Sequence, residues 1–181
     1  MKLIKNIVSL LNREMPIEIL KKRGMKVGKN FSKQQGCFID PSHCFLIEIG
    51  NNVTFSIRVT LLAHDASSKD LIHFAKFGKI IIGDNVFIGA NVTVLPNVTI
   101  GNNSIIGAGS IVTHDIPPDS VVAGNPAKII STTEEYKMKL EKQLENSKAF
   151  SEDYTIRKNV DKIKKNELKD STNKYGICFI K

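Results

Sequence analysis

Apolar residues return at every sixth position through the middle of the chain. The register is unbroken from Ile82 onward and is visible before it, at Ile49, Phe55 and Leu61, then Ile82, Ile88, Val94, Ile100, Ile106 and Val112. A helix repeats near 3.6 residues and a strand near 2, so a period of six fits neither element alone. It suits a short strand followed by a corner, with the repeating residue pointing inward. Three such units would close one coil, and stacked coils would form a β-solenoid.

The positions between these residues have the character of corners. The residue four places after each repeating position is small or β-branched, and its even offset puts it on the inward side: Val86, Val92, Val98, Ser104, Ser110 and Ile116. The residue one place after is often glycine and is followed by Asp, Ala or Asn. We expect these corner residues to supply the positive φ of a tight turn. An ordinary β-sandwich would explain alternation, but not six consecutive units in step.

The pattern divides the chain into three segments. Residues 1–24 predict short helices, with an amphipathic start and Pro16 as a break or first-turn residue. Residues 25–131 predict the solenoid, and a slip of its register indicates an inserted loop at about 63–79. Residues 132–181 return to helical patterning and end in a charged tail. We therefore expect an all-β solenoid with short N-terminal helices and a C-terminal helical extension.

Composition narrows the function classes. The chain has 181 residues, 41% of them hydrophobic, and no run of the roughly 18 to 20 apolar residues that a membrane span needs. The basic, leucine-containing start lacks a cleavage site, so we expect a cytoplasmic protein without membrane insertion. The cysteines Cys37, Cys44 and Cys178 are odd in number and match no common metal spacing. The net charge of +8 comes without a nucleic-acid reader motif, so we expect no nucleic-acid partner.

One stretch carries a family resemblance. IGDNVFIGANVTVLPNVTIGNNSIIGAGSIVTHDIPPDSVVAGNPAKII closely resembles the hexapeptide-repeat acyltransferases, which include galactoside, maltose, serine and xenobiotic O-acetyltransferases and capsule and lipopolysaccharide sugar acetyltransferases. The resemblance covers roughly residues 25–131. It implies a left-handed parallel β-helix, whereas the general preference for right-handed crossovers would predict the opposite hand. It also implies a homotrimer that binds acetyl-CoA in the groove between two subunits.

His64 is the candidate catalytic residue. It stands in VTLLAHDASSKD, where the inserted loop leaves the repeat, and a side chain at the root of such a loop is well placed to meet a ligand. Acyl transfer from a thioester to an alcohol needs a base for the hydroxyl proton, and imidazole is suited to that task near neutral pH. The resemblance places the family's catalytic histidine at this point. A loop histidine that merely caps a turn is the structural alternative.

Three further residues are candidates for the acceptor site. A base histidine usually needs an acceptor on its other nitrogen, and Asp65, Asp40 or a backbone carbonyl could provide it. Asp65 is adjacent, although neighbouring strand residues point to opposite sides. The resemblance implies that acidic or amide residues in the earlier coil that contains Asp40 help to bind acceptor hydroxyls. His43 lies near Asp40 in sequence and could reach the same groove.

The resemblance also implies a set of cofactor contacts. Backbone groups of Ala90 in FIGAN, and of Gly107 and Ala108 in IGAGS, match positions that contact the pantetheine arm, and small residues let the arm approach closely. Lys128 in NPAKII matches a basic residue that meets the nucleotide phosphates. Thr113 and His114 match a Thr-Lys or Thr-Arg pair that touches coenzyme A. Here a histidine replaces the basic residue, which puts that phosphate contact in doubt.

These features favour an acetyl-CoA-dependent O-acetyltransferase acting on a hydroxyl of a sugar or glycan precursor, by direct transfer in a ternary complex. The same chemistry on an antibiotic or other xenobiotic alcohol is the alternative, and a non-catalytic scaffold is a more remote one. A zinc carbonic anhydrase on the same solenoid would need a histidine pair spaced by four residues. His64 and His73 do not have that spacing, and we expect no metal cofactor.

Overall fold

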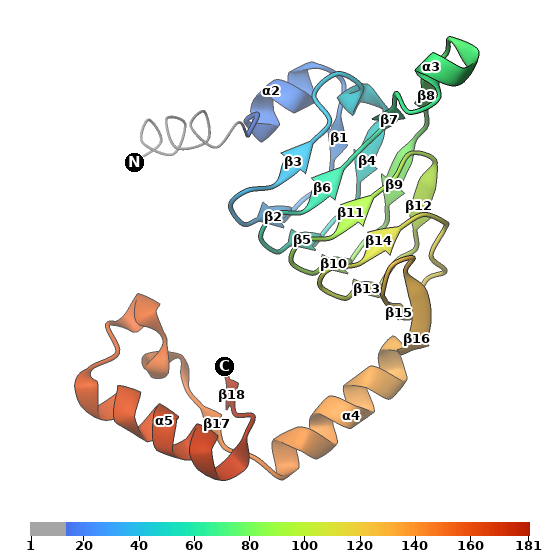
Figure 1. Cartoon of the computed structure of the whole chain (residues 1–181). Helices are drawn as coiled ribbons and strands as arrows, with labels where there is room; N and C mark the ends of the chain where they lie inside the picture. Colours follow the sequence, from blue (N-terminus) through green and yellow to red (C-terminus); the bar gives the residue numbers. More distant parts are fainter. Residues whose placement is uncertain (1–13) are drawn as a thin grey trace. The chain divides into compact units, whose positions relative to one another are not determined.

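The computed structural model describes residues 14–181 and places them in two compact units, Met1–Thr133 and Glu134–Lys181, which are described separately (Figure 1). The amphipathic start expected at residues 4–11 lies outside the described residues. The first unit begins with the short helix α2 (Ile17–Lys22), which follows Pro16 and buries Leu20. Pro16 therefore stands immediately before a helix, where its fixed φ and missing N–H are tolerated.

The strands of the first unit are short, and successive strands belong in turn to three sheets (Figure 1). The first sheet contains β1 (Lys26–Val27), β4 (Ile47–Ile49), β9 (Ile80–Ile82) and β12 (Val98–Ile100). The second contains β2 (Ser32–Lys33), β5 (Thr54–Phe55), β10 (Phe87–Ile88), β13 (Ile105–Ile106), β15 (Ser120–Ala123) and β16 (Lys128–Thr132). The third contains β3 (Phe38–Ile39), β6 (Thr60–Leu61), β11 (Thr93–Val94) and β14 (Ile111–Val112). Within these three sheets the pairings are parallel, except that β16 returns antiparallel to β15.

The sixfold apolar register is the core of this unit. Ile49, Ile82 and Ile100 pair in succession in the first sheet, so each buried residue stacks on the equivalent residue one turn away. The repeating positions from Phe55 to Val112 are at most 1% exposed, and the six predicted inward positions from Val86 to Ile116 are at most 7% exposed. Both inward-facing predictions are confirmed. The core forms because each turn covers the apolar row of the next, as in other repeat folds.

The corners differ from the prediction in one respect. The positive φ falls three residues after the repeating position, as at Asn85 (57°), Asn91 (57°) and Asn103 (58°), and not at the glycines one residue after it. Those glycines are needed because neighbouring turns approach closely. A Cβ at Gly83 would lie 2.2 Å from Asn102 Oδ1, and one at Gly89 would lie 2.6 Å from Ala108 N. The sequence signal for a corner was right, but its glycine permits stacking and its asparagine makes the turn.

Two insertions leave the stack at the same corner, which we call the third-sheet corner because it follows the third-sheet strands. Equivalent residues of neighbouring turns are 18 apart in the regular region, but 22 apart across the segment after β3 and 33 apart across the segment after β6. The longer insertion contains β7 (His64–Asp65), α3 (Lys69–Ile72) and β8 (Lys76–Phe77), with β7 and β8 antiparallel. The shorter one contains the 3-10 turn Cys44–Leu46. A loop was expected at about 63–79, and the structure has one there.

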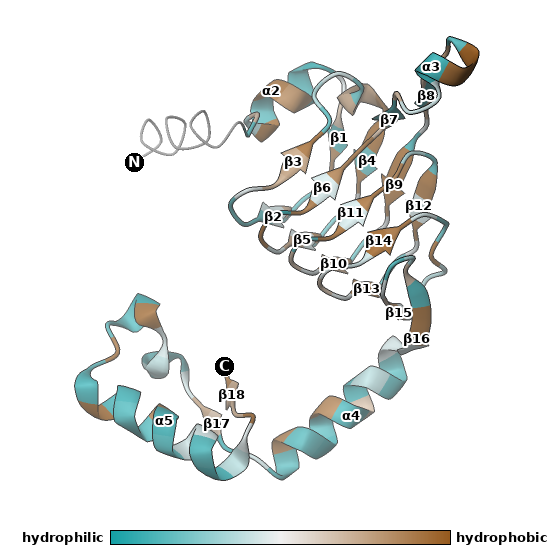
Figure 2. Cartoon of the chain, viewed as in Figure 1, coloured by the Kyte–Doolittle hydropathy of each residue, from teal (hydrophilic) through white to brown (hydrophobic). Residues whose placement is uncertain are grey.

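The second unit is helical and polar. It contains α4 (Thr133–Glu145), which starts at the unit boundary, and α5 (Lys162–Tyr175), whose first turn is capped by the Asp161 side chain. Short strands β17 (Ala149–Phe150) and β18 (Phe179–Ile180) pair in parallel, and 3-10 turns cover Glu152–Tyr154 and Ile156–Lys158. Figure 2 shows α5 to be mostly hydrophilic. Among the described residues, no helix combines the length and apolarity that crossing a membrane requires.

Candidate active site

Asp40 and His64 meet at the third-sheet corner although they are 24 residues apart. Asp40 directly follows β3, and His64 begins β7 three residues after the end of β6. Because Ile39 pairs with Leu61, the two side chains leave neighbouring turns at the same edge of the sheet. His64 Nδ1 lies 2.5 Å from Asp40 Oδ2. The fold therefore supplies a carboxylate partner for the candidate base.

The Asp40 carboxylate is fully buried and is held in its ionised form. Burial alone raises the pKa of Asp40, but the hydrogen bond with His64 and those donated by the backbone N–H groups of Ser42 (3.0 Å) and His43 (3.3 Å) outweigh it, so the pKa is lowered. An ionised carboxylate can only accept a hydrogen bond, so Nδ1 of His64 carries the proton. The Nε2 atom then has a free lone pair, which is the arrangement that a general base requires.

His43 lies against the same pair. Its ring centroid is 4.7 Å from that of His64, and its Nδ1 lies 3.8 Å from Asp40 Oδ2. That Nδ1 atom is buried and has no hydrogen-bond partner. The His43 ring also stacks near Phe77, with 6.0 Å between the ring centroids. The sequence placed His43 near Asp40, and the structure brings both to His64.

Asp65 points elsewhere. Its carboxylate pairs with Lys76 Nζ (2.8 Å) and accepts hydrogen bonds from the N–H and the hydroxyl of Ser67. The hydrogen bond from Lys76, and then those from Ser67, lower the pKa of Asp65. These contacts brace the base of the loop between β7 and β8. Of the alternatives left open by the sequence, the structure brings Asp40 to His64 and turns Asp65 toward Lys76.

The cluster also has the composition of a metal site. Asp40, His43 and His64 each present one ligand atom, and these atoms lie within 4.8 Å of one another. A metal ion bound there would have to replace the 2.5 Å contact between Asp40 and His64. Metal–nitrogen and metal–oxygen bonds near 2 Å would keep those two ligand atoms farther apart than this contact. The geometry is that of a hydrogen-bonded pair.

Ala90, Gly107 and Ala108 lie in one column at a different edge, which we call the second-sheet corner because it follows the second-sheet strands. Ala90 follows β10, Gly107 and Ala108 follow β13, and the two turns are joined by a hydrogen bond from Gly109 N to Ala90 O (2.7 Å). A Cβ at Gly107 would lie 3.0 Å from that of Ala123. The column therefore offers backbone groups and little side chain, which suits the close approach of an extended ligand.

The remaining predicted cofactor residues are dispersed. Thr113 and His114 follow β14 at the third-sheet corner, where the Thr113 hydroxyl lies 2.7 Å from His114 Nδ1. Lys128 begins β16 opposite Ala123, at the far end of the second sheet, and is exposed. His73 is exposed at the end of α3 with a φ of 61°, and it is not part of the Asp40–His43–His64 cluster.

Arg58 was missed by the sequence reading. It occupies the positive-φ position of the second-sheet corner (57°), where the other turns have Gly36, Asn91 and Gly109. A long basic side chain at a position otherwise held by Gly or Asn was the available signal. It borders an open hollow of about 550 Å³ lined by Gln35, Gly36, Ile57, Arg58 and Thr60.

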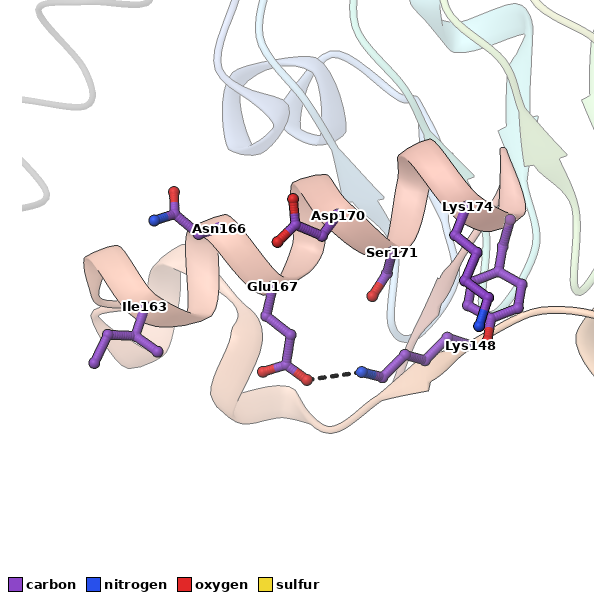
Figure 3. Close-up of a pocket in the computed structure, with 8 residues that line it drawn as sticks. Lys148, Ile163, Asn166, Glu167, Asp170, Ser171 and Lys174 are labelled. Atoms are coloured by element: carbon purple, nitrogen blue, oxygen red, sulfur yellow. Dashed lines mark hydrogen bonds and ion pairs between the residues drawn. The ribbon is translucent and has the colours of Figure 1, made fainter.

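A cavity of about 570 Å³ lies in the second unit, and none of the predicted site residues lines it (Figure 3). Lys148 Nζ pairs with Glu167 at 2.7 Å, and Tyr154 donates to the same carboxylate. Glu167 raises the pKa of Lys148 and of Tyr154, while their hydrogen bonds lower the pKa of Glu167. In the cavity wall the charges of Lys148 and Glu167 therefore compensate each other.

Comparison with known proteins agrees with the repeat architecture. Residues 79–114 match the family described as bacterial transferase hexapeptide (six repeats). The chain is 38% identical to Protein CapG of Staphylococcus aureus over 159 residues, which is 84% of this chain and 87% of CapG. It is 40% identical to a solved maltose O-acetyltransferase from Clostridium difficile 630, with a TM-score of 0.54 over 60% of this chain and 59% of that one.

A second solved neighbour carries a ligand. It is the hexapeptide-repeat acetyltransferase VCA0836 of Vibrio cholerae O1 biovar eltor, complexed with acetyl coenzyme A, at 26% identity and a TM-score of 0.55 over 61% of each chain. The chain thus spans about three fifths of both solved neighbours. The similarity expected from the sequence is confirmed, and so is the enzyme class, since these relatives are acetyltransferases. The chain belongs to the bacterial hexapeptide-repeat transferase family.

Proposed function

We propose that the chain is an acetyl-CoA-dependent O-acetyltransferase that modifies a hydroxyl of a sugar or glycan precursor in the cytoplasm. The observation that carries this proposal is the Asp40–His64 pair, with an ionised buried carboxylate 2.5 Å from the imidazole Nδ1. The maltose O-acetyltransferase and the neighbour complexed with acetyl coenzyme A support the acceptor class and the acyl donor. We further propose that the three sheets form a left-handed parallel β-helix and that the chain works as a homotrimer.

In the proposed reaction His64 acts as the general base. Its Nε2 takes the proton of the acceptor hydroxyl as the oxygen attacks the thioester carbon. Asp40 keeps the imidazole in the required tautomer and stabilises the imidazolium that forms. The carbon–sulfur bond then breaks, and the imidazolium returns its proton to the departing sulfur. Acetyl transfer is direct, because the base acts on the acceptor and no acyl-enzyme is needed.

The separation of the two corners supports a site shared between subunits. The second-sheet corner carries Ala90 and Ala108, whereas His64 lies at the third-sheet corner. Residues 59–62 run between these edges, and four residues of extended chain span about 13 Å at 3.3 Å per residue. A base must be within hydrogen-bond reach of the acceptor hydroxyl, which itself touches the thioester. The corner of one subunit and His64 of a neighbouring subunit would meet that requirement.

The test is a thiol-release assay with acetyl-CoA and a panel of sugars and nucleotide sugars. Replacing His64 by alanine should lower kcat by at least about 100-fold, because general-base catalysis contributes 10²–10⁴. His73→Ala is the matched control, since His73 is an exposed histidine on the same inserted loop. The mechanism is wrong if His64→Ala transfers acetyl groups as fast as the wild type. The shared groove is wrong if the active species sediments as a monomer.

A further inference from the structure

Arg58 stands where the turn geometry favours a different residue. An L-residue with a Cβ is disfavoured at positive φ, and glycine or asparagine tolerates it best. The equivalent positions on the neighbouring turns follow that rule with Gly36, Asn91 and Gly109. Arg58 has a φ of 57° at this position, and its N–H bonds Gln35 O as the corner requires. A long side chain held in an unfavourable conformation is often found where it meets a ligand.

The turn above makes room for this side chain. A Cβ at Gly36 would lie 2.9 Å from Arg58 Cγ, so the arginine stem lies across the glycine. The Glu14 carboxylate is engaged by other groups: it pairs with Lys33 at 2.5 Å and accepts a hydrogen bond from the Gly36 N–H. Among residues 14–181, no carboxylate forms an ion pair with Arg58. The arginine stem thus lies over Gly36, and the exposed side chain has no ion-pair partner among these residues.

The hollow beside Arg58 suits a sugar that carries an acid. The Arg58 guanidinium offers a planar set of donors, and the Thr60 hydroxyl and Gln35 amide add groups that can bind hydroxyls. Ile57 is 44% exposed in the same wall and provides an apolar surface for a sugar ring. This combination of one cation, neutral polar groups and one apolar residue matches an acidic sugar better than a hydrocarbon.

The order of the turns separates this site from the acyl-donor contacts. Along the second-sheet corner the sequence of turns is Gly36, Arg58, Ala90 and Ala108, with Lys128 beyond them. The proposed donor contacts occupy the end from Ala90 to Lys128. Arg58 lies on the other side of Ala90 and on the same turn as His64, since β5, β6 and β7 are consecutive. An acceptor bound at Arg58 would therefore lie on the side of Ala90 away from Lys128.

We propose that Arg58 binds an anionic group of the acyl acceptor, a carboxylate or a phosphate. The inference rests on the proposed function and names its substrate class: an acidic or phosphorylated sugar. A charged, bidentate contact of this kind orients the acceptor as well as binding it. Arg58 is then a specificity residue on one subunit, facing the base of its neighbour.

The test compares glucose, glucuronic acid and glucose 6-phosphate, both as acceptors in thiol release and as ligands by calorimetry with coenzyme A bound. The wild type should favour one or both acids over glucose, and the two acids distinguish a carboxylate from a phosphate source. Arg58→Asn should lose that preference by about tenfold to a hundredfold, the cost of a hydrogen bond to a charged group. Arg58→Lys should retain part of it, because the charge remains but the planar fork does not.

Asn is the residue of the equivalent position on the next turn, so Arg58→Asn should fold, and a melting curve verifies this. Arg157→Asn is the matched control, since it removes the same charge from an exposed site in the second unit. The inference is wrong if the wild type binds neither acid better than glucose, or if Arg58→Asn keeps the preference. A raised KM for acetyl-CoA would instead assign Arg58 to the donor. Acetyl transfer to neutral sugars alone would leave the proposed function standing and reject only the anion site.

Discussion

At the scale of single residues, the proposed function rests on one buried carboxylate. Asp40 accepts hydrogen bonds from His64, Ser42 and His43, so each oxygen has partners and the charge is stabilised. Most buried polar groups in proteins are satisfied in this way. The same contacts fix the imidazole tautomer of His64. Asp40 therefore links the stability of the corner to the reactivity of the base.

Replacing Asp40 by asparagine should disable the base while preserving its volume. The amide cannot stabilise an imidazolium, and its NH₂ group can hold Nδ1 as an acceptor, which puts the proton on Nε2. We expect kcat to fall by about 10²–10⁴-fold, as for other histidines that lose their carboxylate. Steady-state thiol release measures it.

Asp65→Asn provides the comparison for this variant. Asp65 neighbours His64 in sequence but pairs with Lys76. Its replacement should change kcat by less than the Asp40 variant does. Equal losses from the two variants would contradict the assignment of Asp40 as the orienting group.

Asp40 should also make stability depend on acid. Its pKa in the folded chain is below its ordinary value of 3.8, so the folded state binds the proton less readily than the unfolded state. The resulting stabilisation is complete above about pH 5 and is lost as the pH falls through the folded pKa. Urea unfolding at about pH 6 and about pH 3 should show a larger loss for the wild type than for Asp40→Asn. Identical losses would mean that Asp40 is not stabilised by these contacts.

At the scale of elements, the turns are joined by an asparagine ladder. The ladder runs along the corner that follows the first-sheet strands, which we call the first-sheet corner. There the side-chain amide of each asparagine donates a hydrogen bond of 2.8–3.0 Å to the equivalent residue on the next turn: Asn30 to Asn52, Asn52 to Asn85, Asn85 to Asn103 and Asn103 to Asp119. All five residues have positive φ. One residue type thus satisfies two demands, because asparagine tolerates the left-handed region and its amide reaches the neighbouring turn.

Asn85 separates these two contributions. Asn85→Ala loses both ladder bonds and puts at positive φ a residue that lacks asparagine's tolerance of that region, so the free energy of unfolding should fall by about 1–3 kcal/mol. Asn85→Gly loses the same bonds but accepts the φ, so it should fall by less. Denaturant titrations compare the two variants. If glycine costs as much as alanine, the backbone conformation contributes little and the ladder dominates.

At the scale of the whole molecule, the separation of the two corners decides how a site can form. In the proposed function the donor column and the base lie at different corners of one subunit, and a symmetric assembly would repeat the same edge contact around its axis. Two defective subunits should therefore complement each other. His64→Ala lacks the base, and Ala108→Arg obstructs the donor column.

Co-expression of these two variants provides the measurement. Each alone should be inactive, while a mixed trimer should regain activity at about one of its three sites, because only one of its interfaces pairs an intact His64 with an intact donor column. Differently tagged subunits allow the mixed species to be purified before thiol release is assayed. Mixed assemblies with no activity would contradict a site built from His64 of one subunit and Ala108 of another.

The sequence by itself determined the repeat, the inward residues and the position of the inserted loop, and it predicts His64 as the base. These are local properties: a buried position every six residues is written directly in the order of apolar side chains. It misassigned the positive φ, because glycine is compatible both with a turn and with close stacking, and only contacts such as Gly83 with Asn102 distinguish them.

Only the tertiary structure decided which carboxylate serves His64. Asp65 is next to it in the chain, yet Asp40, 24 residues away, makes the contact, because parallel stacking brings equivalent corners together and alternation turns neighbours apart. The exceptional place of Arg58 also became visible only when its φ was set beside those of Gly36, Asn91 and Gly109. The physical reason is the same: a repeat specifies its own turn locally, but the site is assembled between turns.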